Sequence, residues 1–332
     1  MYPELFEIPF IHWAVPTYGV MIAAGFLCAV FVIRRLSRDI TPDPQYVYNG
    51  AMYALIAAVA GSRLFYVVHH LEQFQGRWLS VFAVWQGGLE LLGGAFLAIA
   101  VIFFYLWCHK LPIRRYLDIA AIGLTVALGF GRIGCFLKSD CFGRPTELAW
   151  GVRFPYGSDV YRSQVYPNLK RGRAEPQLKL PAEFFEVHNG MPYLKPYESL
   201  TEEQKRAVTK GEYRCLPVHP TQLYSSANAF LLCIVLYFFR RRAQNAAKTK
   251  DARKLFAKPG CTFALMFILY GTARFLIEFV RDDNPFEYGW LMVYKGGTIS
   301  QNLSLYLIAL GAVLMVVFER MQADGVALKP GG

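Results

Sequence analysis

Seven apolar stretches, separated by polar connections, dominate the pattern of this chain. A helix that crosses the hydrocarbon core of a bilayer needs about 20 predominantly apolar residues. Each of the seven stretches is close to that length. We therefore expect spanning helices at residues 16–33, 47–68, 88–108, 117–137, 220–239, 260–279 and 301–318.

This pattern predicts an α-helical integral membrane protein with seven transmembrane helices. Five of the six connections are short, but residues 138–218 are too many for a bare loop and should carry structure of their own. We therefore divide the chain into three parts. These are the first four helices (1–137), a head inserted between helices 4 and 5 (138–218), and the last three helices with a tail (219–332).

The distribution of arginine and lysine predicts the orientation. Basic residues gather in the connections at 34–38, 110–115 and 240–258 and again in the tail, whereas the alternate connections hold few. Short cytoplasmic loops carry such an excess, and long loops translocate largely regardless of charge. We expect the N-terminus and the head outside, and the C-terminus in the cytoplasm.

Local signals give a first outline of the head. Residues 150–155 and 158–166 have the alternation and the proline and glycine punctuation of strands. Ser199 and Glu202 have the spacing of a capping box that opens a short helix through Val208, which Gly211 can end.

Composition narrows the function classes. Of 332 residues, 55% are hydrophobic and the net charge is +11, with a mean hydropathy of +0.27. The basic residues lie at the ends of apolar runs, as topology signals do, so nucleic acid is not an expected partner. A basic head suits anionic phospholipid, although solubility alone explains its charge equally well.

Residues 1–10 lack the basic region of a cleavable signal peptide. The seven cysteines show neither a disulfide framework nor metal-ligand spacing.

Charged and strongly polar residues inside the predicted spans are the main functional signal. A charge at the bilayer centre costs about 2.5–3.5 kcal/mol on insertion scales, so such residues usually face a protein interior or a polar cavity. Arg132 lies between glycines at the end of the fourth span, where it could also simply snorkel to the interface. The other such residues are Arg63, Glu90, the group His219, Gln222 and Tyr224, and the group Arg274, Glu278 and Arg281.

The last group has an informative spacing. Arg274 and Glu278 are four residues apart and Arg281 is three further on, so all three share one helical face. One carboxylate can neutralise one arginine and hold the other in place. An ion pair with no chemical role is the alternative. Together with Arg132, however, the excess of guanidinium calls for an anion, and a lipid phosphate binds guanidinium in a bidentate fork.

The remaining polar positions are ambiguous when each is considered alone. His219 could cap the fifth helix, although Gln222 and Tyr224 add donors at the same depth. Tyr18 could belong to the aromatic belt of the membrane interface. Gln301 and Ser304 open the last span one turn apart. Cys135 and Cys141 lie near Arg132, which would lower a thiol pKa, but catalysis by a cysteine has weak support without an adjacent base.

Considered together, these motifs resemble those of the bacterial prolipoprotein diacylglyceryl transferases. The match includes Gly61-Ser62-Arg63-Leu64, Gly131-Arg132-Ile133-Gly134, Gly143-Arg144, His219-Pro220-Thr221-Gln222-Leu223-Tyr224, the run from Arg274 to Arg281, and Gln301-Asn302-Leu303-Ser304. The resemblance implies transfer of the diacylglyceryl group from phosphatidylglycerol to the lipobox cysteine of a prolipoprotein signal peptide in the bacterial inner membrane. The product is a thioether, glycerol phosphate leaves, and no metal or organic cofactor is needed.

The resemblance also implies roles for individual residues. Arg132 corresponds to the family's phosphatidylglycerol-binding arginine and Arg274 to its second essential arginine, and with His219 they are the expected catalytic residues. Glu278 and Arg281 would order the second arginine. The other expected substrate-binding residues are Tyr18, Arg63, Gly143, Gln222, Tyr224 and Gln301.

The chain departs from the family pattern at several positions. Leu92-Gly93-Gly94 stands where the family often has His-Gly-Gly, and leucine cannot take a proton. His219, His69 or Glu90 could act as the base instead, or the substrate thiol could ionise beside the arginines. A relative that binds lipid or lipoprotein without transferring is the alternative function. A transporter is disfavoured by the lack of inverted repeats. Three further positions differ from common family residues: Cys135, Asp140 and Ser225.

Overall fold

The computed structural model describes residues 4–8, 13–76, 78–83, 85, 87–188, 190–248, 255–286 and 292–321. Some of the basic residues used to predict orientation lie outside these ranges. They are Arg77, Lys250, Arg253, Lys254 and Lys329.

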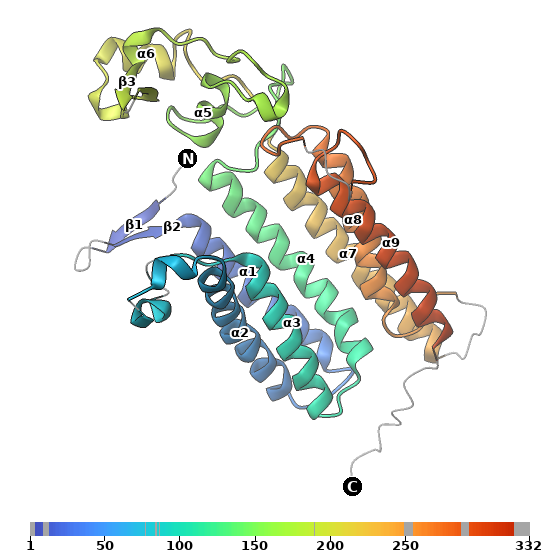
Figure 1. The fold of residues 1–332 in the computed structure, drawn as a ribbon. Helices are drawn as coiled ribbons and strands as arrows, with labels where there is room; N and C mark the ends of the chain where they lie inside the picture. The colour runs from blue at the N-terminus through green and yellow to red at the C-terminus, as the bar shows by residue number, and fades with distance from the viewer. Residues whose placement is uncertain are drawn as a thin grey trace.

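The described residues contain seven helices that are long and apolar enough to cross a membrane, which confirms the predicted number. They run side by side along one direction (Figure 1). They are α1 (Thr17–Ser37), α2 (Gln45–His69), α3 (Leu91–Cys108), α4 (Ile113–Lys138), α7 (Thr221–Lys248), α8 (Cys261–Glu278) and α9 (Ile299–Arg320). Several predicted boundaries are wrong: α1 ends at Ser37 rather than at residue 33, α7 ends at Lys248 rather than at residue 239, and α3 begins at Leu91 rather than at residue 88. Glu90 therefore precedes the helix instead of lying inside the span.

Helix α4 is the central helix, and it packs against α1, α7 and α8. Ile119, Ala121 and Ile122 on this helix are almost fully buried. Close approach depends on small residues. A side chain on Gly25 of α1 would lie 2.8 Å from Cβ of Phe130, and one on Gly61 of α2 would lie 2.5 Å from the carbonyl oxygen of Gly93. Small residues let helix backbones approach in this way.

The segment between α4 and α7 forms a separate layer at the end of the bundle where α4 ends and α7 begins (Figure 1). It contains α5 (Asp159–Val165), the antiparallel strands β3 (Phe185–His188) and β4 (Met191–Leu194), and α6 (Glu202–Thr209). It has its own apolar core, which includes Phe154, Val160, Tyr161, Cys215 and Val218. Near the N-terminus, β1 (Glu4–Ile8) pairs with β2 (Trp13–Pro16). The short 3-10 helices are η1 (Leu71–Phe74), η2 (Trp78–Phe82), η4 (Leu169–Arg171), η5 (Ala182–Phe184) and η6 (Tyr197–Ser199).

Two predicted strands in this segment are wrong. Most of residues 158–166 form helix α5 instead, and Ser158 caps this helix by accepting a hydrogen bond from the backbone N–H of Tyr161 at 3.2 Å. Residues 150–155 form no strand and make only an isolated bridge between Val152 and Val218.

The predicted short helix is confirmed as α6, but its capping box lies two residues later than expected. Thr201 accepts from the backbone N–H of Gln204, and the Gln204 side chain accepts from the backbone N–H of Thr201. Thr201 and Gln204 therefore fill the positions that the sequence assigned to Ser199 and Glu202.

Candidate active site

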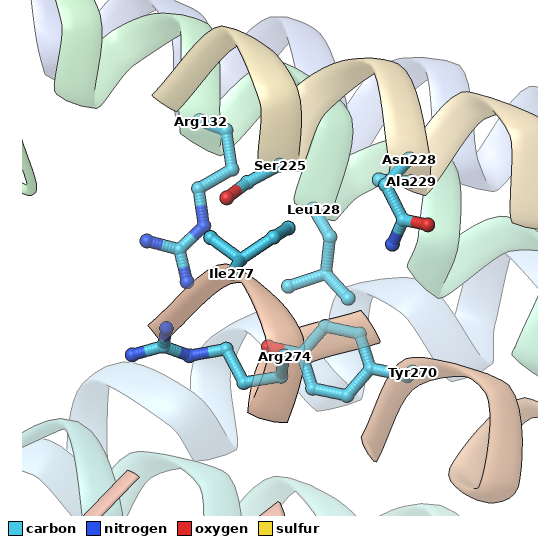
Figure 2. A pocket seen from close by; sticks show the side chains of 8 residues that line it. All are labelled: Leu128, Arg132, Ser225, Asn228, Ala229, Tyr270, Arg274 and Ile277. Carbon is cyan, nitrogen blue, oxygen red and sulfur yellow. The ribbon is translucent and has the colours of Figure 1, made fainter. Parts of the chain in front are cut away.

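Two of the predicted arginines face each other across a narrow cavity between α4, α7 and α8. Figure 2 shows Arg132 of α4 and Arg274 of α8 with both guanidinium groups extended toward the same side, away from Asn228 and the Tyr270 ring. The cavity is lined by Leu128, Arg132, Ser225, Asn228, Ala229, Tyr270, Arg274 and Ile277. The structure thus brings together two cations that lie far apart in the sequence.

Arg274 is held by two side chains. Its Nη1 donates to Oε2 of Glu278 at 2.5 Å, as the four-residue spacing predicted, and its Nη2 donates to Oγ of Ser300 at 2.9 Å. The Glu278 side chain is fully buried and also accepts from Asn284 at 2.6 Å and from Thr298 at 2.9 Å. A buried carboxylate with this many donors is fixed in position. Glu278 therefore orients Arg274 rather than serving as a mobile acid.

Arg281 pairs with a carboxylate that sequence reasoning missed. Its Nε and Nη2 donate to the two oxygens of Asp283 at 2.9 and 2.5 Å, in a bidentate fork, while Nε lies 3.7 Å from Glu278. The signal was present, because two aspartates directly follow Arg281. Seeing it required knowing that α8 ends at Glu278 and that the chain then turns back.

Charge at the site is unbalanced in favour of an anion. Arg274 and Arg281 have Glu278 and Asp283 as partners. Within the described ranges, no carboxylate forms an ion pair with Arg132, and its Nη1 lies 3.6 Å from the Cys141 sulfur. One guanidinium is therefore left without a carboxylate in a largely buried place. Such a charge favours a bound anion.

Cys141 lies in the turn after α4, beside Arg132. The pKa of its thiol is lowered, because the thiol of Cys135 donates a hydrogen bond to it and because Arg281 and Arg132 are nearby, against the opposing effect of burial. The sequence pointed to this pair of cysteines only through their closeness to Arg132.

The first residues of α7 hold the backbone turn that follows α4. Thr221 donates to the carbonyl oxygen of Cys141 at 2.8 Å, and Gln222 donates to the carbonyl oxygen of Asp140 at 2.7 Å. Gly143 lies against His219 so closely that an added Cβ would stand 2.6 Å from the His219 carbonyl oxygen. Gln222 and Gly143, both expected to bind substrate, thus shape the backbone next to Arg132.

His219 and Tyr224 belong to one hydrogen-bonded chain. Nδ1 of His219 lies 3.4 Å from the Tyr224 hydroxyl, which accepts from Nε1 of Trp150 at 2.7 Å. The backbone N–H of His219 donates to the carbonyl oxygen of Arg144 at 3.0 Å. The imidazole therefore lies at the base of the head, next to Gly143, whose backbone N–H donates to the carbonyl oxygen of His219.

Two other predicted positions occupy helix starts. Tyr18 lies in the first turn of α1, packs against Gly134, and has Nζ of Lys138 5.9 Å from its ring centre. Gln301 is buried and forms the capping box of α9 with Thr298, since each donates a backbone N–H to the other's side chain.

Arg63 has a structural set of partners. It is buried in α2, and its guanidinium donates to four backbone carbonyl oxygens in the connection to α3, at 2.6 to 3.2 Å; they belong to Ser80, Val81, Gly87 and Gly88. Four of the five N–H donors of the guanidinium are therefore used to hold that connection.

The two alternative base candidates, at the end of α2 and just before α3, pair with each other. Nδ1 of His69 lies 2.7 Å from Oε2 of Glu90. Leu92, where the resembling family often has histidine, lies on the outer surface of α3 with 69% of its area exposed. These three positions belong to the α2–α3 pair, whereas the arginine cavity is lined by α4, α7 and α8.

Comparison with known proteins agrees with the motifs. The model of the prolipoprotein diacylglyceryl transferase family matches residues 3–317. A phosphatidylglycerol–prolipoprotein diacylglyceryl transferase of Clostridium tetani is 27% identical over 316 residues, covering 94% of this chain and 95% of the relative. The protein of the same name from Stenotrophomonas maltophilia is 31% identical over 317 residues, covering 93% and 88%. That of Burkholderia lata is 28% identical over 323 residues, covering 95% and 94%.

Proposed function

Because the chain belongs to the prolipoprotein diacylglyceryl transferase family, we propose that it transfers the diacylglyceryl group of phosphatidylglycerol to the lipobox cysteine of a prolipoprotein. The cysteine sulfur forms a bond to the glyceryl carbon, and the bond from that carbon to the phosphate oxygen breaks. The thiol proton leaves, and glycerol phosphate departs with the bonding electron pair. The observation that carries this proposal is the pair of guanidinium groups that share one side of the cavity, where Arg132 has no carboxylate partner among the described residues.

The two arginines bind the phosphate in this proposal. Negative charge grows on the leaving phosphate in the transition state, so a preorganised cation stabilises that state more than the bound lipid. Arg132 is the primary phosphate ligand, since its positive charge is not matched by a carboxylate. Glu278 and Ser300 hold Arg274 at the second position, and this removes the cost of ordering a long side chain during the reaction.

His219 is the proposed acceptor of the thiol proton. Leucine at position 92 cannot do this, and His69 is engaged with Glu90. His219 lies against Gly143, two residues beyond Cys141, and Cys141 contacts Arg132. Tyr224 and Trp150 form a hydrogen-bonded chain that fixes the imidazole orientation.

We place the protein in the bacterial inner membrane as a multi-pass protein. The basic connections at the α1–α2, α3–α4 and α7–α8 ends put these ends in the cytoplasm, together with the C-terminus. The N-terminus and the head of residues 138–218 are then extracytoplasmic, which is where signal peptides of exported lipoproteins present their cysteine. The arginine cavity lies in the parts of α4 and α8 nearest to this head.

A transfer assay with purified protein, phosphatidylglycerol and a lipobox peptide tests the function. The expected product is the peptide carrying one diacylglyceryl mass on cysteine, and Leu92→His is expected to leave the rate undiminished because position 92 is exposed. Phosphatidylglycerol bound by folded protein with no peptide product would support the inactive binding relative instead. Lipid-dependent flux in vesicles without a covalent product would support a transporter.

A further inference from the structure

Three side chains with metal-binding atoms gather next to Arg132. The sulfur atoms of Cys135 and Cys141 and a carboxylate oxygen of Asp140 all lie within 4.8 Å of one another. Cys135 is buried in the last turns of α4, and the other two residues belong to the turn that follows. This group was not predicted from the sequence, because two cysteines six residues apart with no histidine match no common zinc motif.

The backbone after α4 assembles this group. Ser139 adopts a left-handed conformation with φ of 70°, and the backbone N–H of Asp140 returns to the carbonyl oxygen of Cys135 at 3.1 Å. Cys141 is also left-handed, with φ of 58°. The chain therefore folds back over the helix end, and the Thr221 and Gln222 side chains hold it there from α7. The three ligand atoms converge without any further folding step.

One carboxylate oxygen of Asp140 has no hydrogen-bond partner among the described residues. Oδ1 of Asp140 is buried and accepts no hydrogen bond from any residue that the structure describes, whereas Oδ2 lies 3.2 Å from Nζ of Lys138. An unsatisfied buried acceptor is costly, because it has lost its hydrogen bonds to water, and so it rarely persists without a further ligand. This observation is independent of the cysteine spacing and points to a bound cation.

The chemistry of the donors selects a thiophilic divalent ion. Two thiolates and a carboxylate are zinc ligands, and tetrahedral zinc holds two thiolates about 3.8 Å apart, given Zn–S bonds of about 2.3 Å. The observed spacing, below 4.8 Å, needs only a small contraction. Three anionic ligands around Zn²⁺ leave one negative charge. Lys138, whose Nζ lies 3.2 Å from Oδ2 of Asp140, offsets that charge.

We propose that Cys135, Cys141 and Asp140 form a Zn²⁺ site, with the fourth position open to water. The ion links the end of α4 to the turn that leads into the head. Its binding free energy therefore stabilises the folded backbone around Arg132. This site is separate from the proposed transfer reaction, which needs no metal.

Zinc binding to the full-length protein in detergent tests the site. Protein purified with a thiol reductant and stripped with a chelator is titrated with Zn²⁺ against a chromophoric competitor. One equivalent is expected to bind, and to raise the thermal unfolding temperature. Cys135→Ser, Cys141→Ser and Asp140→Asn are each expected to weaken binding by at least about 10- to 100-fold, the loss typical of damage to a metal site.

Cys108→Ser is the matched control, because Cys108 is exposed at the end of α3 and lies outside the group. Asp140→Asn keeps the shape of the side chain, so it reports on the site even where a cysteine variant fails to fold. Absence of one-equivalent binding in the wild-type protein, or unchanged binding in Asp140→Asn and Cys141→Ser, would overturn the proposal. So would a count of five free thiols under reductant, which would show a resistant Cys135–Cys141 disulfide in place of the ligands.

Discussion

Among the described residues, the three guanidinium groups of the site have two carboxylates as ion-pair partners, and this imbalance is the central chemical property of the site. Glu278 and Asp283 serve Arg274 and Arg281, so the charge of Arg132 stays available for an anion. A buried ion pair of this kind need not stabilise the fold, since the free energy lost on desolvating the two charges can equal the free energy gained from their attraction. Its value lies in holding Arg274 in one orientation.

Replacing Glu278 by glutamine is expected to destabilise the protein strongly. The variant keeps the shape but leaves Arg274 buried without its countercharge, and breaking such a pair typically costs about 3–5 kcal/mol. Transfer should fall as well, because Arg274 loses its orientation. Thermal unfolding in detergent measures the first effect.

Glu202→Gln is the control for that experiment. Glu202 also pairs with a basic residue on its own helix, Lys205, but its side chain is 81% exposed. Exposed pairs contribute at most about 1 kcal/mol. Equal effects of the two substitutions on unfolding would contradict the orienting role of Glu278.

At the level of single residues, the sequence predicted what local spacing determines. The Arg274–Glu278 contact follows from the four-residue period of a helix and is confirmed. The Arg281–Asp283 fork and the His69–Glu90 pair were missed because they depend on where α8 and α3 end or begin. Helix boundaries are set by tertiary contacts as much as by composition.

Among the elements, the starts of α7 and α9 position the site. Thr221 and Gln222 hold the turn beside Arg132, while Thr298 both caps α9 and donates to Glu278. A helix start is suited to this task, because its first turn has side chains and N–H groups that the helix itself does not use.

Thr298→Ala is therefore expected to cost more stability than loss of a cap alone. A lost threonine cap costs about 1 kcal/mol, and the buried Glu278 loses a donor in addition, so a total of about 2 kcal/mol or more is expected.

Thr201→Ala provides the comparison, because Thr201 forms the same reciprocal box in α6 with no contact to the site. Thermal unfolding of both variants, each measured against the wild type, gives the difference. A Thr298→Ala cost equal to or smaller than the Thr201→Ala cost would show that the bond to Glu278 contributes nothing.

The sequence predicted long helices well and short elements poorly. An apolar run near 20 residues has few alternatives in a membrane. In the head, Ser158 capped a helix where alternation had suggested a strand, and the β3–β4 hairpin was missed although Asn189-Gly190 between the two strands is a strong hairpin signal. In a segment as short as the seven residues of α5, the alternation of apolar and polar residues is a weak signal, and one capping side chain can decide the structure.

For the whole molecule, the arginine cavity and the head lie toward the same end of the bundle, and the proposed orientation puts that end outside. The native Cys108 offers a direct test. It is exposed at the opposite end of α3, next to the basic α3–α4 connection. Treatment of intact cells with a membrane-impermeant maleimide should leave Cys108 unlabelled, and permeabilisation should label it, as read from its proteolytic peptide.

A cysteine introduced at Lys210 reports on the other face. Lys210 follows α6 and is exposed, so Lys210→Cys should react in spheroplasts without permeabilisation. Labelling of Cys108 in intact spheroplasts, together with protection of residue 210, would contradict the proposed topology and indicate the opposite orientation.

The most direct measurement of the central claim is diacylglyceryl transfer by Arg132→Ala and Arg274→Ala, compared with Arg241→Ala. Arg241 is exposed on α7 at the far end from the cavity and serves as the matched loss of one guanidinium. Each variant is assayed in detergent with phosphatidylglycerol and a lipobox peptide, after its fold is checked by thermal unfolding. Loss of one preorganised contact to the developing charge typically costs about 10²- to 10³-fold in rate. We expect at least that loss for Arg132→Ala and Arg274→Ala, and near wild-type transfer for Arg241→Ala. Wild-type turnover in folded Arg132→Ala or Arg274→Ala would contradict phosphate binding by the two arginines.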